Sequence, residues 1–235
     1  GHAGYYPGTA MMHIKVLFAP ETGLLLGAQI AGFDGVDKRL DVFATAIRMG
    51  ATVHDLEGFE LAYAPPFGSA KDPVNMAGFL ATNVLKGDLK LWYAQDFPAA
   101  VDGARIIDVR TREEYDIWHI PGAENVPLPT LREASVSWDP SVPVRLYCAV
   151  GFRSYLAYRS LVQRGFADVK TLSGGSHTFR FWHDLEQSRI EPHAAEIPYA
   201  EGVELAAVAQ GTGEVVDLDC TGLACPGPIM KLSQT

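Results

Sequence analysis

One short stretch of the chain brings together a nucleophile, an arginine and a loop of the kind that holds anions. The apolar residues 144–147 predict a strand that ends at Cys148, and apolar residues at helical spacing after Arg153 predict a helix that ends at Gly165. A cysteine at this junction meets converging backbone N–H groups and the positive end of the helix dipole, and both favour the thiolate. Arg153 can hold an anionic substrate through two parallel hydrogen bonds. The loop between the strand and the helix consists of Ala149, Val150, Gly151 and Phe152, and Ser154 follows the arginine.

Two other interpretations of this stretch stay open. A single cysteine after a buried strand is often only a small core residue, although the arginine, the loop glycine and the following helix favour a reactive Cys148. A cysteine-dependent phosphatase would enclose phosphate with one residue more than the four found here between cysteine and arginine. The shorter loop favours a sulfur-sized group over a phosphate.

Composition excludes several classes of function. The chain has 235 residues, 48% hydrophobic and 20% charged, which is typical of a soluble globular protein long enough for two domains. It holds no run of about 18 apolar residues and no signal-peptide pattern, so neither a membrane span nor membrane binding is predicted. The net charge of −9 argues against a nucleic-acid partner.

The three cysteines, Cys148, Cys220 and Cys225, do not form an even disulfide framework. They therefore indicate reduced thiols and a cytoplasmic protein. Zinc binding or a disulfide is the alternative for Cys220 and Cys225, but a second pair of ligands is missing, so no metal site is predicted.

The periodicity of the first segment, residues 1–88, indicates an α+β domain. Strands are expected at 13–18 and 24–30, and helices at 36–47 and 74–85, with one more short helix opening at a capping box on Thr52. The segment shows no nucleophile with a base and no cluster of metal ligands. By its residues alone it is a structural or association domain.

The second segment, residues 98–190, alternates short apolar strands with helices. Strands at 105–109, 144–148 and 169–172 predict a small doubly wound parallel sheet, an α/β fold. Such folds bind ligands at the carboxyl ends of their strands, which is where Cys148 is expected.

Linkers are expected on both sides of the second segment. Residues 89–97 form the first, and residues 191–213, rich in acids and punctuated by Pro and Gly, form an acidic second one. The last segment, 214–235, opens with a strand, and Pro226 then starts a helix directly after Cys225. This again places a thiol at a positive helix end.

The first segment resembles the dimerisation domain of flavin- and NAD(P)H-dependent disulfide reductases, in the branch that contains coenzyme A–disulfide reductases, NADH oxidases and persulfide reductases. The resembling stretches are residues 2–8, 27–29, 35–39, 62–67 and 70–75. The resemblance implies a homodimer through residues 1–88.

In that branch, a pair of tyrosines reaches the partner subunit's redox cysteine and coenzyme A. Motif position assigns this role to Tyr63 and to Tyr5 in preference to Tyr6. Such a phenol can donate a hydrogen bond to a thiolate or act as a general acid. Packing at an interface is the alternative for each tyrosine.

The cofactors of this branch are FAD, NAD(P)H and coenzyme A, and the resemblance implies them for a longer enzyme. No Gly-x-Gly-x-x-Gly follows a strand in this chain, so we expect it to bind neither FAD nor NAD in the family's way. The chain therefore looks like a fragment of a longer flavoenzyme.

The second segment resembles a rhodanese domain over its full length. The matching stretches are residues 108–110, 114–115, 119–123, 125–127 and 172–175, and Cys148, Gly151, Arg153 and Ser154 match the family's active loop. The resemblance implies that Cys148 accepts a sulfane sulfur as a persulfide and passes it to a thiophile, and that Arg153 and the loop residues form the active site. It assigns Asp108 and Arg110 to supporting the loop.

The last segment resembles the start of a TusA-like (SirA-type) sulfur carrier, through the Cys-Pro-x-Pro motif at residues 225–228. Cys225 is therefore a candidate sulfur carrier. The segment is too short for us to expect an independent fold.

Together, these segments predict a multidomain α+β and α/β fragment of a reductase for coenzyme A disulfide, persulfide or polysulfide, with a sulfurtransferase site at Cys148. Small sulfur species or coenzyme A persulfide are the expected substrates. The alternative is a non-catalytic fragment that only dimerises and docks. A reactive Cys148 that is alkylated faster than Cys220 or Cys225 would favour the first hypothesis.

Overall fold

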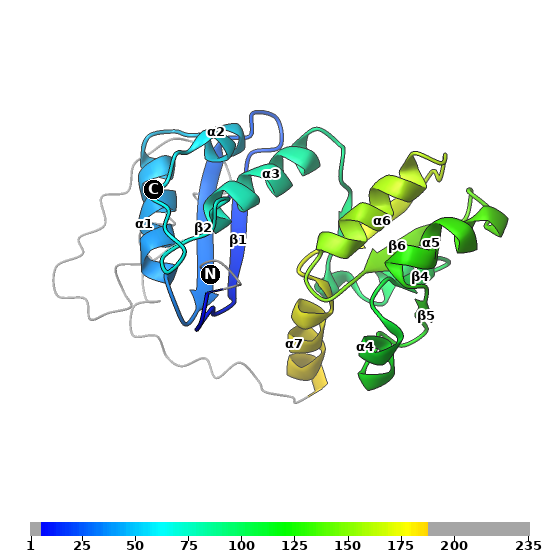
Figure 1. Ribbon diagram of the computed structural model, residues 1–235. Coiled ribbons are helices and arrows are strands. Elements are labelled where there is room, and N and C mark those ends of the chain that lie inside the picture. Colours follow the sequence, from blue (N-terminus) through cyan, green and yellow to red (C-terminus); the bar gives the residue numbers. More distant parts are fainter. Residues whose placement is uncertain (1–5, 188–235) are drawn as a thin grey trace. The chain divides into compact units, whose positions relative to one another are not determined.

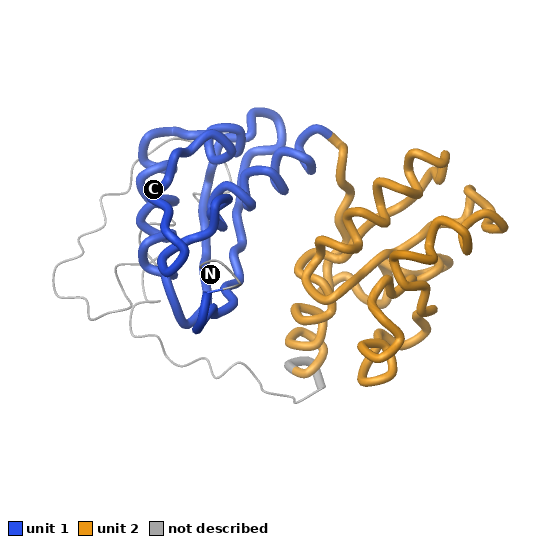
Figure 2. Tube along the Cα trace, viewed as in Figure 1, with its two compact units in different colours: residues 1–86, 196–235 blue, residues 87–195 orange. Residues whose placement is uncertain are grey.

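The computed structural model describes the backbone of residues 6–187 and the side chains of residues 6–184. These residues divide into two compact units, with the boundary between Lys86 and Gly87 (Figure 1, Figure 2). Within the described range, no helix has the length and apolar character needed to cross a membrane.

Unit 1 is an antiparallel hairpin packed against three helices. Strands β1 (Met12–Phe18) and β2 (Leu25–Gly32) pair in register from Met12↔Gly32, and side chains along β1 alternate between partly buried and exposed. The helices are α1 (Val36–Arg48), α2 (Val53–Gly58) and α3 (Pro73–Leu85). The hydrophobic core between the hairpin and the helices contains Leu25, Phe43, Val53, Leu56 and Val74. This confirms the expected α+β domain.

Capping residues define where the helices of unit 1 begin. Thr52 accepts the Asp55 N–H and Asp55 in turn accepts the Thr52 N–H, so the predicted capping box is present at α2. Asp72 and Asn75 form the same reciprocal arrangement at α3, where Pro73 occupies the first helical position.

A buried ion pair holds the segment that joins α2 to α3. The guanidinium of Arg39, on α1, donates to Asp72 Oδ2 at 2.8 Å and to the Phe67 carbonyl at 3.1 Å. Asn75 donates to the carbonyls of Leu56 and Phe59. Because Arg39, Asp72 and Asn75 are buried, these hydrogen bonds hold the segment 59–72 at both of its ends.

Unit 2 contains one parallel sheet with the strand order β3-β7-β6-β4-β5. All neighbouring pairs run parallel, and β6 lies at the centre with all four of its residues buried. Its strands are β3 (Leu91–Trp92), β4 (Arg105–Asp108), β5 (Glu124–Asn125), β6 (Val144–Tyr147) and β7 (Val169–Leu172). The predicted doubly wound parallel sheet is confirmed.

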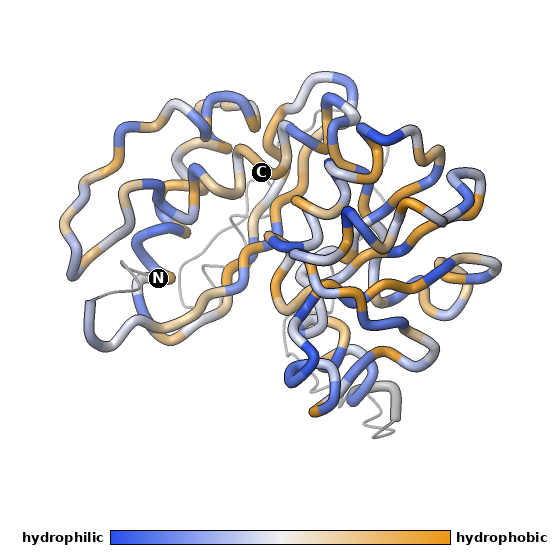
Figure 3. Tube along the Cα trace, turned by 45° about the vertical axis from the view of Figure 1, so that its right-hand side comes forward, coloured by the Kyte–Doolittle hydropathy of each residue, from blue (hydrophilic) through white to orange (hydrophobic). Residues whose placement is uncertain are grey.

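Helices cover both faces of this sheet. Phe179 of α7 packs with Trp92, Ile106 and Tyr147 on one face. Helix α6 contributes buried side chains of its own and lies on the other face, beside α5 (Figure 1). The helices are α4 (Arg112–Ile117), α5 (Leu128–Ala134), α6 (Phe152–Val162) and α7 (Gly175–Gln187), with short 3-10 turns at 94–96, 99–101 and 135–137. The colouring by hydropathy in Figure 3 shows apolar stretches alternating with polar ones along the chain.

Residues 89–97 are not the linker that the sequence suggested. Leu91 and Trp92 pair with Thr171 and Leu172 as an edge strand, and Trp92 and Ala94 are buried in the core of unit 2. A strand of two residues is too short to show the alternation that identifies strands in a sequence. This segment therefore belongs to the fold of unit 2.

Candidate functional site

Cys148 lies at the carboxyl end of the central strand β6, as expected. Its side chain is only 1% exposed, and it is a free thiol. The Gly151 backbone N–H donates to its Sγ at 3.1 Å. A donor aimed at sulfur in this way is suited to hold negative charge on that atom.

Gly151 makes this donor possible. Its φ is 120° and its ψ is −27°, a backbone conformation that residues with a Cβ rarely adopt. It is the N-cap residue of α6, and among the described residues no side chain caps that helix. The first-turn N–H groups of α6, which have no partners inside the helix, therefore face the end of the loop where Cys148 lies.

The start of α7 holds the loop from its other side. The Ser176 N–H donates to the Cys148 carbonyl at 2.8 Å, and the His177 N–H donates to the Ala149 carbonyl at 3.2 Å. Gly175 permits this approach, because a Cβ at that position would lie 2.5 Å from the Ala149 carbonyl oxygen. The loop is thus held by the beginnings of two helices.

Two buried hydroxyl groups complete the support beneath the loop. Ser154 Oγ donates to the Gly151 carbonyl at 2.9 Å and accepts from Thr171 Oγ1 at 2.6 Å. Ser154 was among the expected loop residues, whereas Thr171 of β7 was not. A single threonine inside a strand gives no signal in the sequence that it faces the adjacent loop.

Arg153 differs in its contacts from what we expected. Its two terminal nitrogens donate to both carboxylate oxygens of Glu114, at 2.6 and 2.7 Å, so the bidentate site intended for a substrate anion is occupied by a side chain. The hydrogen bond from Arg153 lowers the pKa of Glu114 to about 2. The same bond raises the pKa of Arg153, and the interaction of Arg153 with Cys148 raises it further.

Glu114 is the member of the site that the sequence analysis left without a role. It also accepts the Thr111 N–H at 3.0 Å and thereby closes the capping box that opens α4. The pattern Thr-x-x-Glu was a detectable signal for the helix start. Its contact with Arg153 spans 39 residues of sequence, and local patterns carry no information about such a distance.

Asp108 and Arg110 form a buried ion pair directly after β4. Arg110 donates from its backbone N–H and its guanidinium to the Asp108 carboxylate, and it also donates to the Trp118 carbonyl. Asn125 binds the carbonyls of both residues. The pair therefore fixes the course of the segment between β4 and α4, the helix that carries Glu114.

The remaining candidates of the sequence analysis belong to other parts of the sequence. Tyr63 belongs to unit 1, where its side chain is half exposed. Tyr5, Cys220 and Cys225 lie outside the described residues.

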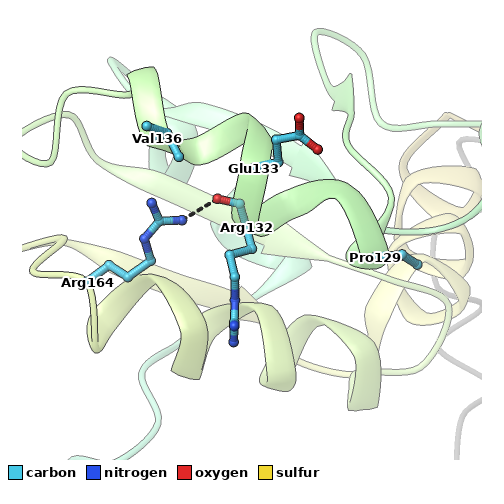
Figure 4. Close-up of a pocket in the computed structure, with 5 residues that line it drawn as sticks. All are labelled: Pro129, Arg132, Glu133, Val136 and Arg164. Atoms are coloured by element: carbon cyan, nitrogen blue, oxygen red, sulfur yellow. Dashed lines mark hydrogen bonds between the residues drawn. The ribbon is translucent and has the colours of Figure 1, made fainter.

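A surface pocket of about 670 Å³ occurs in unit 2, but it is separate from the Cys148 loop. Figure 4 shows it beside α5, where the Arg164 guanidinium donates to the Arg132 carbonyl. Its lining residues are Pro129, Arg132, Glu133, Val136 and Arg164. None of them belongs to the loop that carries Cys148.

The described residues do not fit an FAD or NAD site of the dinucleotide-binding type. The segments that follow the parallel strands β4, β6 and β7 begin with Val109, Cys148 and Ser173, and none of them contains Gly-x-Gly-x-x-Gly. The segment after β6 is the Cys148 loop itself, and the segment after β7 leads into α7, which donates hydrogen bonds to that loop.

Two protein families match the two units. Residues 1–73 match the pyridine nucleotide-disulphide oxidoreductase dimerisation domain, and residues 77–180 match the rhodanese-like domain. A coenzyme A disulfide reductase of Staphylococcus epidermidis is 46% identical over 80 residues, which are 34% of this chain and 18% of that protein.

Two solved structures resemble most of the chain. Reduced Bacillus anthracis CoADR-RHD has a TM-score of 0.74 and 40% identity, over 79% of this chain and 33% of its own. The NAD-dependent persulfide reductase from A. fulgidus has a TM-score of 0.68 and 32% identity, over 76% of this chain and 32% of its own. The chain thus spans about a third or less of the length of these relatives. It joins a pyridine nucleotide-disulphide oxidoreductase dimerisation domain to a rhodanese-like domain, and over more than three quarters of its length it is similar to CoADR-RHD and to the persulfide reductase.

Proposed function

We propose that this chain is a sulfurtransferase that carries sulfane sulfur as a persulfide on Cys148. The observation that carries the proposal is the position of the Cys148 sulfur, which lies at the end of the central strand and accepts the Gly151 N–H at 3.1 Å. Arg153 closes the same loop, and two helix starts and two hydroxyl groups hold the loop in place. A rigid loop with a backbone donor aimed at sulfur is suited to bind and release one sulfur atom.

The transfer consists of two displacements at sulfur. The Cys148 thiolate attacks the outer sulfur of a donor R–S–SH, the donor's S–S bond breaks, and R–S⁻ leaves with the electron pair. Cys148 then carries S–SH. An acceptor thiolate attacks the outer sulfur of this persulfide and regenerates the Cys148 thiolate, so sulfur moves with no net oxidation or reduction.

The same proposal places the chain in a longer enzyme. There it serves as part of an FAD- and NAD(P)H-dependent reductase of coenzyme A disulfide, persulfide or polysulfide that forms a homodimer through unit 1. The relatives named coenzyme A disulfide reductase and NAD-dependent persulfide reductase support this assignment. Tyr63 and Tyr5 would reach the partner subunit's redox site, and Cys225 would act as a further sulfur carrier.

The test is transfer of sulfur to cyanide, followed as thiocyanate formation with an alkyl persulfide or with thiosulfate as donor. We expect activity from the chain and none from Cys148→Ser, while Cys225→Ser, which removes a thiol outside the rhodanese-like segment of the sequence, retains transfer. A folded chain that forms no thiocyanate from either donor would contradict the proposal. It would favour a fragment that only dimerises and docks.

A further inference from the structure

The Arg153–Glu114 pair changes the charge that a substrate meets at the loop. An arginine at this place would attract a dianion if its guanidinium were open. Both terminal nitrogens of Arg153 are instead bound by the two oxygens of Glu114, at 2.6 and 2.7 Å. The two charges largely cancel for a ligand outside the pair, because the donor and the acceptor lie in direct contact.

The side chains at the surface of the loop are apolar. Val150 is 48% exposed and Phe152 is 64% exposed, on either side of Gly151. The loop from Cys148 to Phe152 contains no cationic side chain. The guanidinium of Arg153, the next residue, is paired with Glu114. A donor whose sulfur is attached to an uncharged organic group matches this surface better than a small dianion does.

We propose that Glu114 is a specificity-determining residue that makes the Cys148 site favour organic persulfides over thiosulfate, by binding the guanidinium that would otherwise hold a dianion. This inference rests on the proposed sulfur transfer at Cys148. The low pKa of Glu114, about 2, keeps its carboxylate charged at neutral pH, so the pairing persists under those conditions.

Both donors react by the same displacement but differ in charge. With thiosulfate, the Cys148 thiolate attacks the outer sulfur, the S–S bond breaks and sulfite leaves as a dianion with the electron pair. With R–S–SH, the leaving group is R–S⁻, a monoanion. A positive charge at the loop therefore helps thiosulfate more than it helps the organic persulfide.

The first experiment compares kcat/KM for thiosulfate with kcat/KM for an alkyl persulfide in Glu114→Gln. Glutamine can still accept the Thr111 N–H, so the capping box is retained while the charge is removed. We expect the thiosulfate-to-persulfide ratio to rise about fivefold, the size typical of one partly exposed ion pair. Glu113→Gln is the matched control: it removes the same charge from the adjacent residue of α4, and its ratio should stay that of the wild type.

A purely structural role for Glu114 would lower both rates together and leave the ratio unchanged, which would overturn the inference. An equal rise of the ratio in Glu113→Gln would overturn it as well, because net charge alone would then be the cause. If the wild type transferred sulfur from neither donor, the result would instead contradict the proposed function itself.

A second measurement uses the wild-type chain and needs neither sulfur transfer nor a variant. Cys148 is alkylated by anionic iodoacetate and by neutral iodoacetamide, and the ratio of the two rates is compared with that of free cysteine. A paired Arg153 predicts a ratio no higher than that of free cysteine. A ratio several times higher would mean that the positive charge is open to anions, and would overturn the inference.

Discussion

Each unit of this protein contains an arginine–carboxylate pair joined by two hydrogen bonds, and the two pairs have very different surroundings. In unit 1, Arg39 and Asp72 are 3% and 4% exposed, and their neighbours are helix caps and loop carbonyls. In unit 2, Arg153 and Glu114 are 32% and 35% exposed, and Arg153 interacts with Cys148. The first pair has the environment of a structural element and the second that of a site that meets substrates.

Because of this difference in burial, losing one partner should have a different cost in each pair. A buried pair cannot lose one partner without leaving an uncompensated charge away from water. A pair that is one-third exposed can, because water replaces the missing partner. Substitutions in the Arg39–Asp72 pair should therefore lower the stability of unit 1, whereas substitutions of Glu114 should mainly change the choice of substrate.

The largest effect is expected at the buried pair. Asp72→Asn keeps the shape of the side chain but leaves Arg39 charged and buried, and should lower the free energy of unfolding of unit 1 by about 3–5 kcal/mol. Urea unfolding followed by circular dichroism measures this. All four tryptophans lie in unit 2, so their fluorescence follows the other unit in the same experiment.

Asp41→Asn is the control for Asp72→Asn, because it removes the same charge from an exposed position on α1. It should change the free energy of unfolding by less than about 0.5 kcal/mol. Equal losses from the two variants would mean that burial does not distinguish the pairs.

The second-largest effect is expected at Gly175, where the backbone of α7 contacts the Cys148 loop. Gly175→Ala adds a Cβ that would lie 2.5 Å from the Ala149 carbonyl oxygen, and Gly165→Ala adds one at a similarly positive φ with no atom within 4 Å. We expect Gly175→Ala to cost about 1–3 kcal/mol more in unfolding free energy than Gly165→Ala. Tryptophan fluorescence in urea measures both. Equal costs would show that the approach of α7 to the loop is not tight.

A small effect on stability is expected at the exposed pair. Glu114→Gln should lower the free energy of unfolding of unit 2 by about 0.2–1 kcal/mol, the range for partly exposed ion pairs. The same tryptophan measurement applies. A loss as large as that of Asp72→Asn would remove the distinction between the two pairs.

The smallest effect is the pH dependence of that contribution. The pKa of Glu114 is about 2 in the folded protein against an ordinary value of 4.5, so its pairing stabilises the fold fully above pH 4.5. This stabilisation is lost as the pH falls from 4.5 towards 2, because the unfolded chain takes up the proton first. The difference in stability between the wild type and Glu114→Gln should therefore shrink over this window. A difference that stays constant down to pH 2 would contradict the assignment.

The sequence predicted those features that short patterns encode. The order β1, β2, α1 and the strand–loop–helix around Cys148 follow from the spacing of apolar residues and from the turns between them. The edge strand β3 was missed, because two residues cannot show alternation. The pairing of Arg153 with Glu114 and the hydroxyl contact from Thr171 were missed because they join residues far apart in the chain. The motif predicted an arginine at the loop, but not what that arginine binds.

The central claim is that Cys148 carries sulfur, and intact mass spectrometry tests it most directly. The chain and its Cys148→Ser variant are incubated with an alkyl persulfide or polysulfide, and the mass of each is measured before and after cyanide is added. We predict that the wild type gains the mass of one sulfur atom, that cyanide removes it, and that the variant gains none. A wild-type chain that stays folded and unmodified, or a variant that gains the same mass, would contradict the claim.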